Sequence, residues 1–116
     1  MGNYSLAIRM YPEVCLEFDF GSLTTTYSLL GVLQNPSLQT IIQNWTDVPI
    51  WISWDGINNH FPLASGCAWD SDNATNKSRE SGLYIAQGQP FYVMQLGDTV
   101  ATQGSIYLTT FYGQGA

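Results

Sequence analysis

Short runs of β-branched and aromatic residues recur roughly every ten residues along this chain, and Gly, Pro, Asn and Asp separate them. No longer stretch places apolar residues at the spacing of an amphipathic helix. Short strands with turn signals between them are typical of β-sandwiches and jelly rolls. The sequence therefore predicts an all-β fold, a single antiparallel sandwich or jelly-roll-like domain of about eight strands over residues 1–116.

The candidate strands follow from these runs. They cover residues 4–10, 14–20, 23–30, 38–44, 48–54, 60–63, 67–70, 83–86, 91–96 and 105–112. A turn is expected at residues 11–13, between the first two runs. Residues 71–81 form the most polar stretch and are expected to be a surface loop.

Alternation along two of the runs predicts which side chains face the core. In residues 48–54 the core face consists of Val48, Ile50, Ile52 and Trp54. The other face contains Pro49, which cannot donate to a ladder, so this strand is expected at a sheet edge or to start at a bulge. In residues 105–112 both faces carry large side chains, so we expect one face to be covered by the core and the other by a partner or a neighbouring sheet.

Charge is scarce in this chain and excludes some partners. Lys and Arg number 3 against 9 Asp and Glu, which gives a formal net charge of −6. Direct nucleic-acid binding is not expected, because its affinity depends on neutralising phosphates. No apolar stretch approaches the ~20 residues of a membrane helix. Charged residues make up 10% of the chain, against about 25% in typical soluble domains, and an uncharged, aromatic surface predicts contacts with other proteins or a homo-oligomer.

Four aromatic residues are the candidate interface side chains: Trp45, Trp51, Tyr107 and Phe111. They fall on the polar or outer sides of the predicted strands. An exposed aromatic patch marks a protein interface more often than a sugar site, although stacking of sugar rings on these side chains stays open as an alternative. Trp54 and Trp69 are expected in the core from their position in the alternation.

No catalytic or metal site is predicted. His60 is the one histidine, but the chain has no Gly-x-Ser-x-Gly nucleophile elbow. We expect Asp55, Gly56 and His60 to form a structural turn, with positive φ at Gly56 and backbone hydrogen bonds at His60. Residues 70–81 depart from the calcium-loop pattern at three ligand or glycine positions. No cofactor is expected.

The two cysteines, Cys15 and Cys67, lie in strand-like surroundings without a second Cys nearby. This spacing does not fit CxxC redox motifs or zinc sites. We expect two buried free thiols, and a disulfide between them is the alternative.

Several motifs occur in a fixed order along the chain. They are Asn44-Trp45-Thr46-Asp47, Ile52-Ser53-Trp54-Asp55-Gly56, His60-Phe61, Gly82-Leu83-Tyr84 and Phe111-Tyr112-Gly113. Their order and spacing resemble a family of small structural proteins of tailed-bacteriophage virions, over most of residues 21–116.

This resemblance implies a β-sandwich that acts by its place in a virion and performs no chemistry. Its implied partners are other virion proteins, of the capsid, the portal or neck, or the tail, together with further copies of itself. The resemblance implies no catalytic residue. A carbohydrate-binding module of a host-recognition tail fibre or spike is the alternative from a different functional class.

Overall fold

The computed structural model describes residues 8–72 and 85–115. Its elements are β1 (Ile8–Pro12), β2 (Leu16–Asp19), the short 3-10 turn η1 (Phe20–Ser22), β3 (Ser28–Val32), β4 (Ser37–Asn44), β5 (Ile50–Ser53), β6 (Phe61–Leu63), β7 (Ala68–Asp72), β8 (Pro90–Gln95) and β9 (Ser105–Gly115). No α-helix occurs in these residues, and none of them forms a helix that could cross a membrane. The predicted all-β fold is confirmed.

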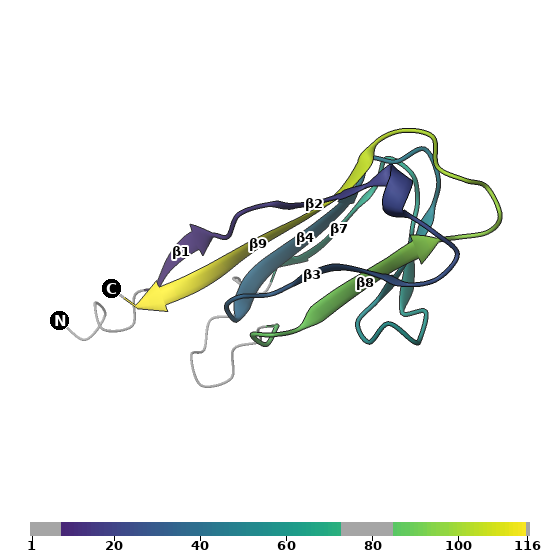
Figure 1. Cartoon of the computed structure of the whole chain (residues 1–116). Coiled ribbons are helices and arrows are strands. Elements are labelled where there is room, and N and C mark those ends of the chain that lie inside the picture. Colours follow the sequence, from purple (N-terminus) through teal and green to yellow (C-terminus); the bar gives the residue numbers. More distant parts are fainter. Residues whose placement is uncertain (1–7, 73–84, 116) are drawn as a thin grey trace.

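The strands form two antiparallel sheets that pack against each other (Figure 1). One sheet, here called the β9 sheet, has the order β2-β9-β4-β7, and β1 continues beside β9 on the side of β2. The other, the β8 sheet, has the order β3-β8-β5-β6. Successive strands from β2 onward cross repeatedly between the two sheets, which is the jelly-roll topology of two Greek keys.

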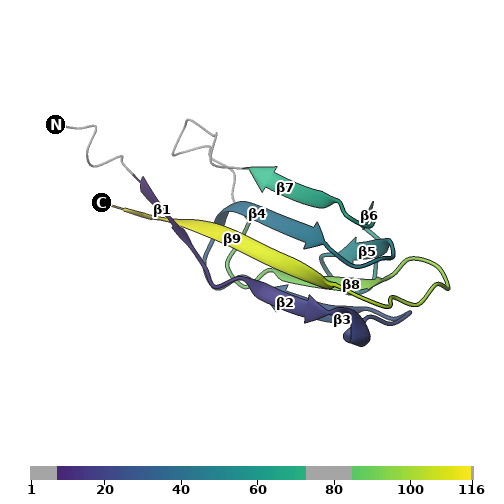
Figure 2. The same cartoon turned by 90° about the horizontal axis from the view of Figure 1, so that it is seen from above.

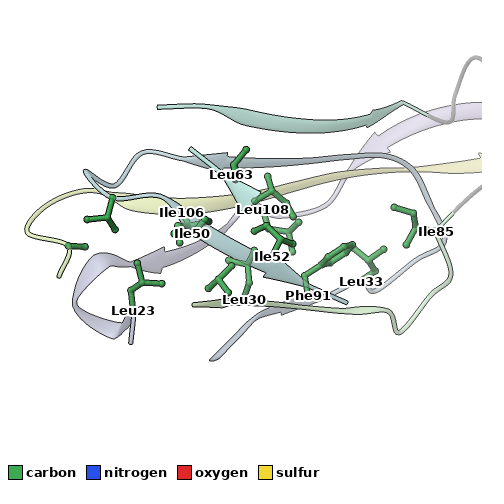
Figure 3. Close-up of a cluster of buried hydrophobic side chains, with 14 residues drawn as sticks. Leu23, Leu30, Leu33, Ile50, Ile52, Leu63, Ile85, Phe91, Ile106 and Leu108 are labelled. Atoms are coloured by element: carbon green, nitrogen blue, oxygen red, sulfur yellow. The ribbon is translucent and has the colours of Figure 1, made fainter. Parts of the chain in front are cut away.

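The core lies between the two sheets and is apolar (Figure 3). In the β9 sheet Ile42 lies opposite Leu108, and in the β8 sheet Ile52 lies opposite Val93. These four side chains are almost completely buried. The predicted core face of residues 48–54 is confirmed, because Val48, Ile50 and Ile52 are buried and Trp54 packs against the core.

The predicted position of β5 at a sheet edge is wrong. This strand lies between β8 and β6 and pairs with both. Pro49 precedes the first strand residue, Ile50, so no ladder hydrogen bond is lost. The carbonyl of Pro49 still accepts a bond of 3.0 Å from the backbone N–H of Leu96.

The expected turn at residues 11–13 is also wrong. β1 and β2 follow one another along the same edge of β9, β1 opposite residues 111–115 and β2 opposite residues 105–108. The N–H of Glu13 donates to the carbonyl of Thr110 at 2.9 Å, so the chain stays beside β9 between the two strands. β1 and the end of β9 extend beyond the rest of the sandwich as a ribbon (Figures 1 and 2). On this ribbon the rings of Tyr11 and Tyr112 stack at 5.7 Å.

Both cysteines are free and exposed, so the expectation of buried thiols is wrong. Cys15 lies in the connection between β1 and β2, and its Sγ atom is 3.5 Å from the hydroxyl of Thr109, which points outward from β9. Cys67 lies in the turn that precedes β7, after Gly66. Strand-like sequence around a cysteine does not predict burial when the residue falls in a connection or on an outer face.

Candidate functional site

The four predicted interface residues do not form one patch. Trp51 lies opposite Met94 on the outer side of the β8 sheet. Tyr107 and Phe111 point outward from the β9 sheet, on the other side of the molecule, since the residues that alternate with them on β9 are buried. Trp45 follows β4 at one end of the sandwich and is 62% exposed. Any contacts made by these residues would therefore involve different sides of the subunit.

The outer surface of the β8 sheet, here called the β8 face, is uncharged and apolar. Its members on the strands are Leu29, Trp51, Pro62, Tyr92 and Met94, with the fully buried Ser53 opposite Tyr92, and Leu96 follows directly after β8. Leu29 lies opposite Tyr92, and Trp51 lies between Met94 and Pro62, so the face crosses all four strands of the sheet. Leu29 is 50% exposed. A monomer that exposed an apolar surface of this kind would risk nonspecific association.

The outer surface of the β9 sheet, here called the β9 face, combines aromatic and amide side chains. It consists of Gln39, Ile41, Gln43, Tyr107, Thr109 and Phe111, which lie opposite one another on β4 and β9. All six are half-buried. Acidic residues lie beside it, with Asp70 opposite Ile41 and Glu17 opposite Tyr107. A partner for this face would meet aromatic and amide groups with negative charge at their margins.

The first motif, residues 44–47, folds into a buried hydrogen-bond network. Asn44 is 1% exposed, and its Nδ2 atom donates to the carbonyls of Val48, Leu63 and Ala64 at 2.9, 3.2 and 3.3 Å. Its Oδ1 atom accepts from the backbone N–H and the hydroxyl of Thr46, at 3.1 and 2.6 Å. This single amide thus ties the end of β4 to the start of β5 and to the end of β6.

Asp47 continues this network to another loop. Its carboxylate accepts from the backbone N–H of Thr102 at 2.9 Å and from the Thr102 hydroxyl. The loop between β8 and β9 is thereby fastened to the turn between β4 and β5. The polar side chains of residues 44–47 therefore stabilise the turn between β4 and β5, and their hydrogen bonds are made to other residues of the same subunit.

The second motif forms another closed turn, between β5 and β6. The Asp55 carboxylate accepts from the N–H groups of Ile57 and Asn58 at 2.8 Å each, and from the hydroxyl of Ser53 at 2.9 Å. Gly56 has φ of +76°, and an added Cβ atom would lie 3.3 Å from the Tyr92 ring. Positive φ at this position disfavours residues with a side chain.

His60 completes the turn through backbone contacts. Its Nδ1 atom accepts from the N–H of Trp54 at 2.9 Å, and its own N–H donates to the carbonyl of Ile52 at 3.1 Å. Because Nδ1 is an acceptor, the neutral ring carries its proton on Nε2. The imidazole therefore stabilises the backbone at Trp54, where the chain leaves β5.

We predict different effects for two substitutions of His60. His60→Ala removes the acceptor for the Trp54 N–H and is expected to lower the free energy of unfolding by about 1 kcal/mol. His60→Gln retains an acceptor of similar reach and is expected to preserve most of the stability. Urea unfolding of both variants checks this, and equal losses in the two would mean that the imidazole contact does not stabilise the turn.

Hydrogen bonds lower the pKa of two aspartates. The N–H groups of Asn58 and Ile57, together with the Asn58 side chain, hold the pKa of Asp55 far below its ordinary value. The hydroxyl and the N–H of Thr102 lower the pKa of Asp47 in the same way. Both carboxylates are exposed, so solvent weakens these effects on stability.

These shifts predict a loss of stability in acid. A carboxylate with a lowered pKa in the folded state stabilises the fold above its unfolded pKa of about 3.9, and this contribution is lost as the pH falls through the folded pKa. The melting temperature is expected to fall between about pH 5 and pH 2, and less steeply in Asp55→Asn. Asp98→Asn is the control, because the exposed Asp98 side chain accepts no hydrogen bond from a described residue. If the melting temperature of Asp55→Asn fell with decreasing pH as steeply as that of the unmodified chain, this prediction would be contradicted.

The structure also forms a pocket that the sequence patterns did not reveal. It is open, has a volume of about 350 Å³, and is lined among the described residues by Trp54, His60, Phe61 and Trp69. Alternation predicted both tryptophans in the core, and both do pack against it, but each is only half-buried. The sequence signal for this pocket is the adjacent pair His60-Phe61, because the edge strand β6 begins at Phe61, directly after the turn that contains Trp54 and His60.

The described residues contain no group of three or more His, Cys, Asp or Glu side chains that could hold a metal ion. Residues 73–81 of the candidate calcium loop and the whole Gly82-Leu83-Tyr84 motif lie outside the described residues.

Comparisons with known proteins give no family for this chain. No family model matches the sequence, and no curated protein matches it either. One solved structure, from Bacillus endospore appendages described as a novel family of disulfide-linked pili, aligns with 91% of this chain and 89% of its own. The two chains share 14% sequence identity at a TM-score of 0.45. A likeness this distant supports no conclusion about function.

Proposed function

We propose that this chain is a non-enzymatic structural subunit of a tailed-phage virion, which packs through uncharged surfaces into a capsid-decorating or head-to-tail neck assembly. The observation that carries the proposal is the β8 face. It is apolar, uncharged and spread over four strands, and Trp51, a predicted interface residue, lies within it. Aromatic residues and Met are enriched at protein interfaces, where charge is depleted.

We propose a second copy of the chain as an occupant of this face, because the face itself carries no charge that would oppose the contact. Subunits with a formal net charge of −6 repel one another. None of the side chains that form the β8 face is charged, and a carboxylate beside it, that of Asp55, accepts from Ser53 opposite Tyr92. We expect a specific contact of this kind to bury more than about 1,000 Å².

The resemblance of the ordered motifs to tailed-phage structural proteins supports the virion as the location and other virion proteins as additional partners. The hydrogen bonds of two of these motifs also support a structural function. Asn44, Thr46 and Asp47 hold one turn, and Ser53 and Asp55 hold another. Their polar atoms are used in maintaining the shape of the subunit.

Sedimentation velocity of the purified full chain at increasing concentration tests the proposal. We expect the sedimentation coefficient to rise with concentration for the unmodified chain, and Trp51→Lys to keep the subunit monomeric. Gln87→Lys is the control, because it adds the same charge at an exposed position in the turn before β8, outside the residues that form the β8 face. A chain that stays monomeric at all concentrations, or equal effects of the two substitutions, would contradict assembly through this face.

A further inference from the structure

The open side of the sandwich contains an aromatic pocket that is separate from both outer faces. β6 ends the β8 sheet and β7 ends the β9 sheet, and these two edge strands lie on the same side of the molecule (Figure 2). Phe61 comes from β6, Trp69 from β7, and Trp54 and His60 from the turn between β5 and β6. The volume of about 350 Å³ lies within the usual range of small-molecule sites.

Aromatic packing holds the walls of this pocket in place. The rings of Trp54 and Trp69 are 6.3 Å apart with an angle of 75° between their planes, and Phe61 lies 5.0 Å from Trp69. Behind them Phe91 is fully buried, with its ring 5.1 Å from that of Trp54. The two indoles thus form nearly perpendicular surfaces anchored on the core, so little ordering is needed when a ligand binds.

Polar donors accompany these apolar walls. The His60 ring is fixed by its Nδ1 contact with the Trp54 backbone, which leaves the Nε2–H group as a donor. The indole N–H groups of Trp54 and Trp69 are donors as well. No described residue accepts a hydrogen bond from any of these three groups. The pocket is open, so these groups can bond to water, and they can also donate to oxygen atoms of an occupant that lies against the rings.

We propose that this pocket binds a sugar ring of a glycan. A pyranose presents a C–H surface that can pack on an indole, and its hydroxyl groups can accept from the three N–H donors. An apolar side chain of a protein partner could pack on the same rings, but it would supply no acceptor for these donors, whereas the hydroxyl groups of a sugar would. A sugar satisfies both the apolar walls and the donors.

The proposed sugar site is a second function of the subunit, and it does not depend on the proposed assembly through the β8 face. The β8 face and the pocket share no residue, so a subunit can occupy both at once. Failure of sugar binding would leave the assembly proposal unaffected, and a monomeric chain could still bind a sugar.

Two-dimensional NMR of the isotope-labelled full chain tests the inference directly. The chain has four tryptophans, and their indole N–H signals serve as internal probes. During titration with maltotriose, cellotriose and tri-N-acetylchitotriose, we expect at least one sugar to shift the signals of Trp54 and Trp69. The signals of Trp45 and Trp51, which lie outside the pocket, should stay in place. N-acetyltryptophanamide serves as the probe for an aromatic protein side chain.

Substitution then tests the pocket itself. Trp69→Phe is expected to weaken binding of the active sugar about tenfold, because a large ring and one donor are lost. Trp45→Phe should leave the dissociation constant unchanged within about twofold. Shifts caused only by N-acetyltryptophanamide would overturn the proposal in favour of a protein occupant. Absence of shifts with every sugar, or sugar shifts confined to Trp45 and Trp51, would also overturn it.

Discussion

Asn44→Leu is expected to lower the free energy of unfolding by about 3 kcal/mol or more. The side chain is 1% exposed and makes five hydrogen bonds. Leucine has a similar size but leaves the Thr46 N–H and several carbonyls without this partner in a buried setting. Urea unfolding monitored by tryptophan fluorescence measures the loss.

Two further variants separate hydrogen bonding from packing at this position. Gln43→Leu removes an amide from the neighbouring residue, whose side chain is half-buried on the β9 face and bonds to no described residue, and it should change stability by less than about 0.5 kcal/mol. Asn44→Asp preserves the shape of the side chain. It replaces the Nδ2 atom, which donates to three backbone carbonyls, with a carboxylate oxygen that would face the same three carbonyl oxygens. We expect Asn44→Asp to be at least as damaging as Asn44→Leu. If Asn44→Leu and Gln43→Leu unfolded alike, the network would not stabilise the fold.

Gly104→Ala is the second substitution with a large expected effect. Gly104 has φ of +93°, and a Cβ atom built there would lie 2.1 Å from the carbonyl oxygen of Trp45 and 2.9 Å from the Cα atom of Thr46. These atoms belong to the backbone, so they cannot move aside as a flexible side chain could. Next to this contact the Trp45 N–H donates to the Ser105 carbonyl at 2.9 Å. We expect a loss of roughly 3 kcal/mol or more in the free energy of unfolding.

Gly97→Ala provides a closely matched control. Gly97 has φ of +91°, but a Cβ atom added there would have nothing within 4 Å of it. This variant should therefore lose only the conformational preference, about 1 kcal/mol. The difference in denaturant midpoint between Gly104→Ala and Gly97→Ala measures how much of the stability loss comes from the close approach of the backbone at Trp45 to Gly104. Equal midpoints would mean that Gly104 is required for its conformation alone.

Much of the fold could be predicted from residue alternation. The inward positions of Ile50, Ile52, Ile106 and Leu108 follow from a period of two, because one side of each strand faces the core. Alternation does not specify which strands are neighbours. Pairing is decided by the complete topology, and Pro49 is compatible with a strand paired on both sides because it precedes the first strand residue, Ile50.

The turns were predictable where their residues carry local chemistry. Asp55-Gly56 signals a turn by itself, and the positive φ of Gly56 agrees with it. The larger part of the requirement for Gly104 has no such local signal, because it comes from the backbone at Trp45, which is distant in the sequence. The network of Asn44 likewise depends on β6, which only the folded chain brings to the end of β4.

The pocket shows why core and surface assignments from alternation are incomplete. Trp54 and Trp69 do face inward, but they lie where the sandwich opens between β6 and β7, so part of each ring remains accessible. Trp51 does lie on the side of β5 opposite the core, as alternation predicts. Sequence patterns do not specify that Trp51 and Tyr107 belong to opposite sides of the molecule, since this depends on which sheet contains each strand.

Electron cryo-microscopy of the assembled particle tests the central proposal most directly. Our account predicts that a neighbouring subunit or another virion protein covers Trp51 and Met94 on the β8 face. The same map would reveal whether the pocket at Trp69 stays open to solvent. A particle in which the β8 face of every copy remains in contact with solvent would contradict the proposal that this face drives assembly.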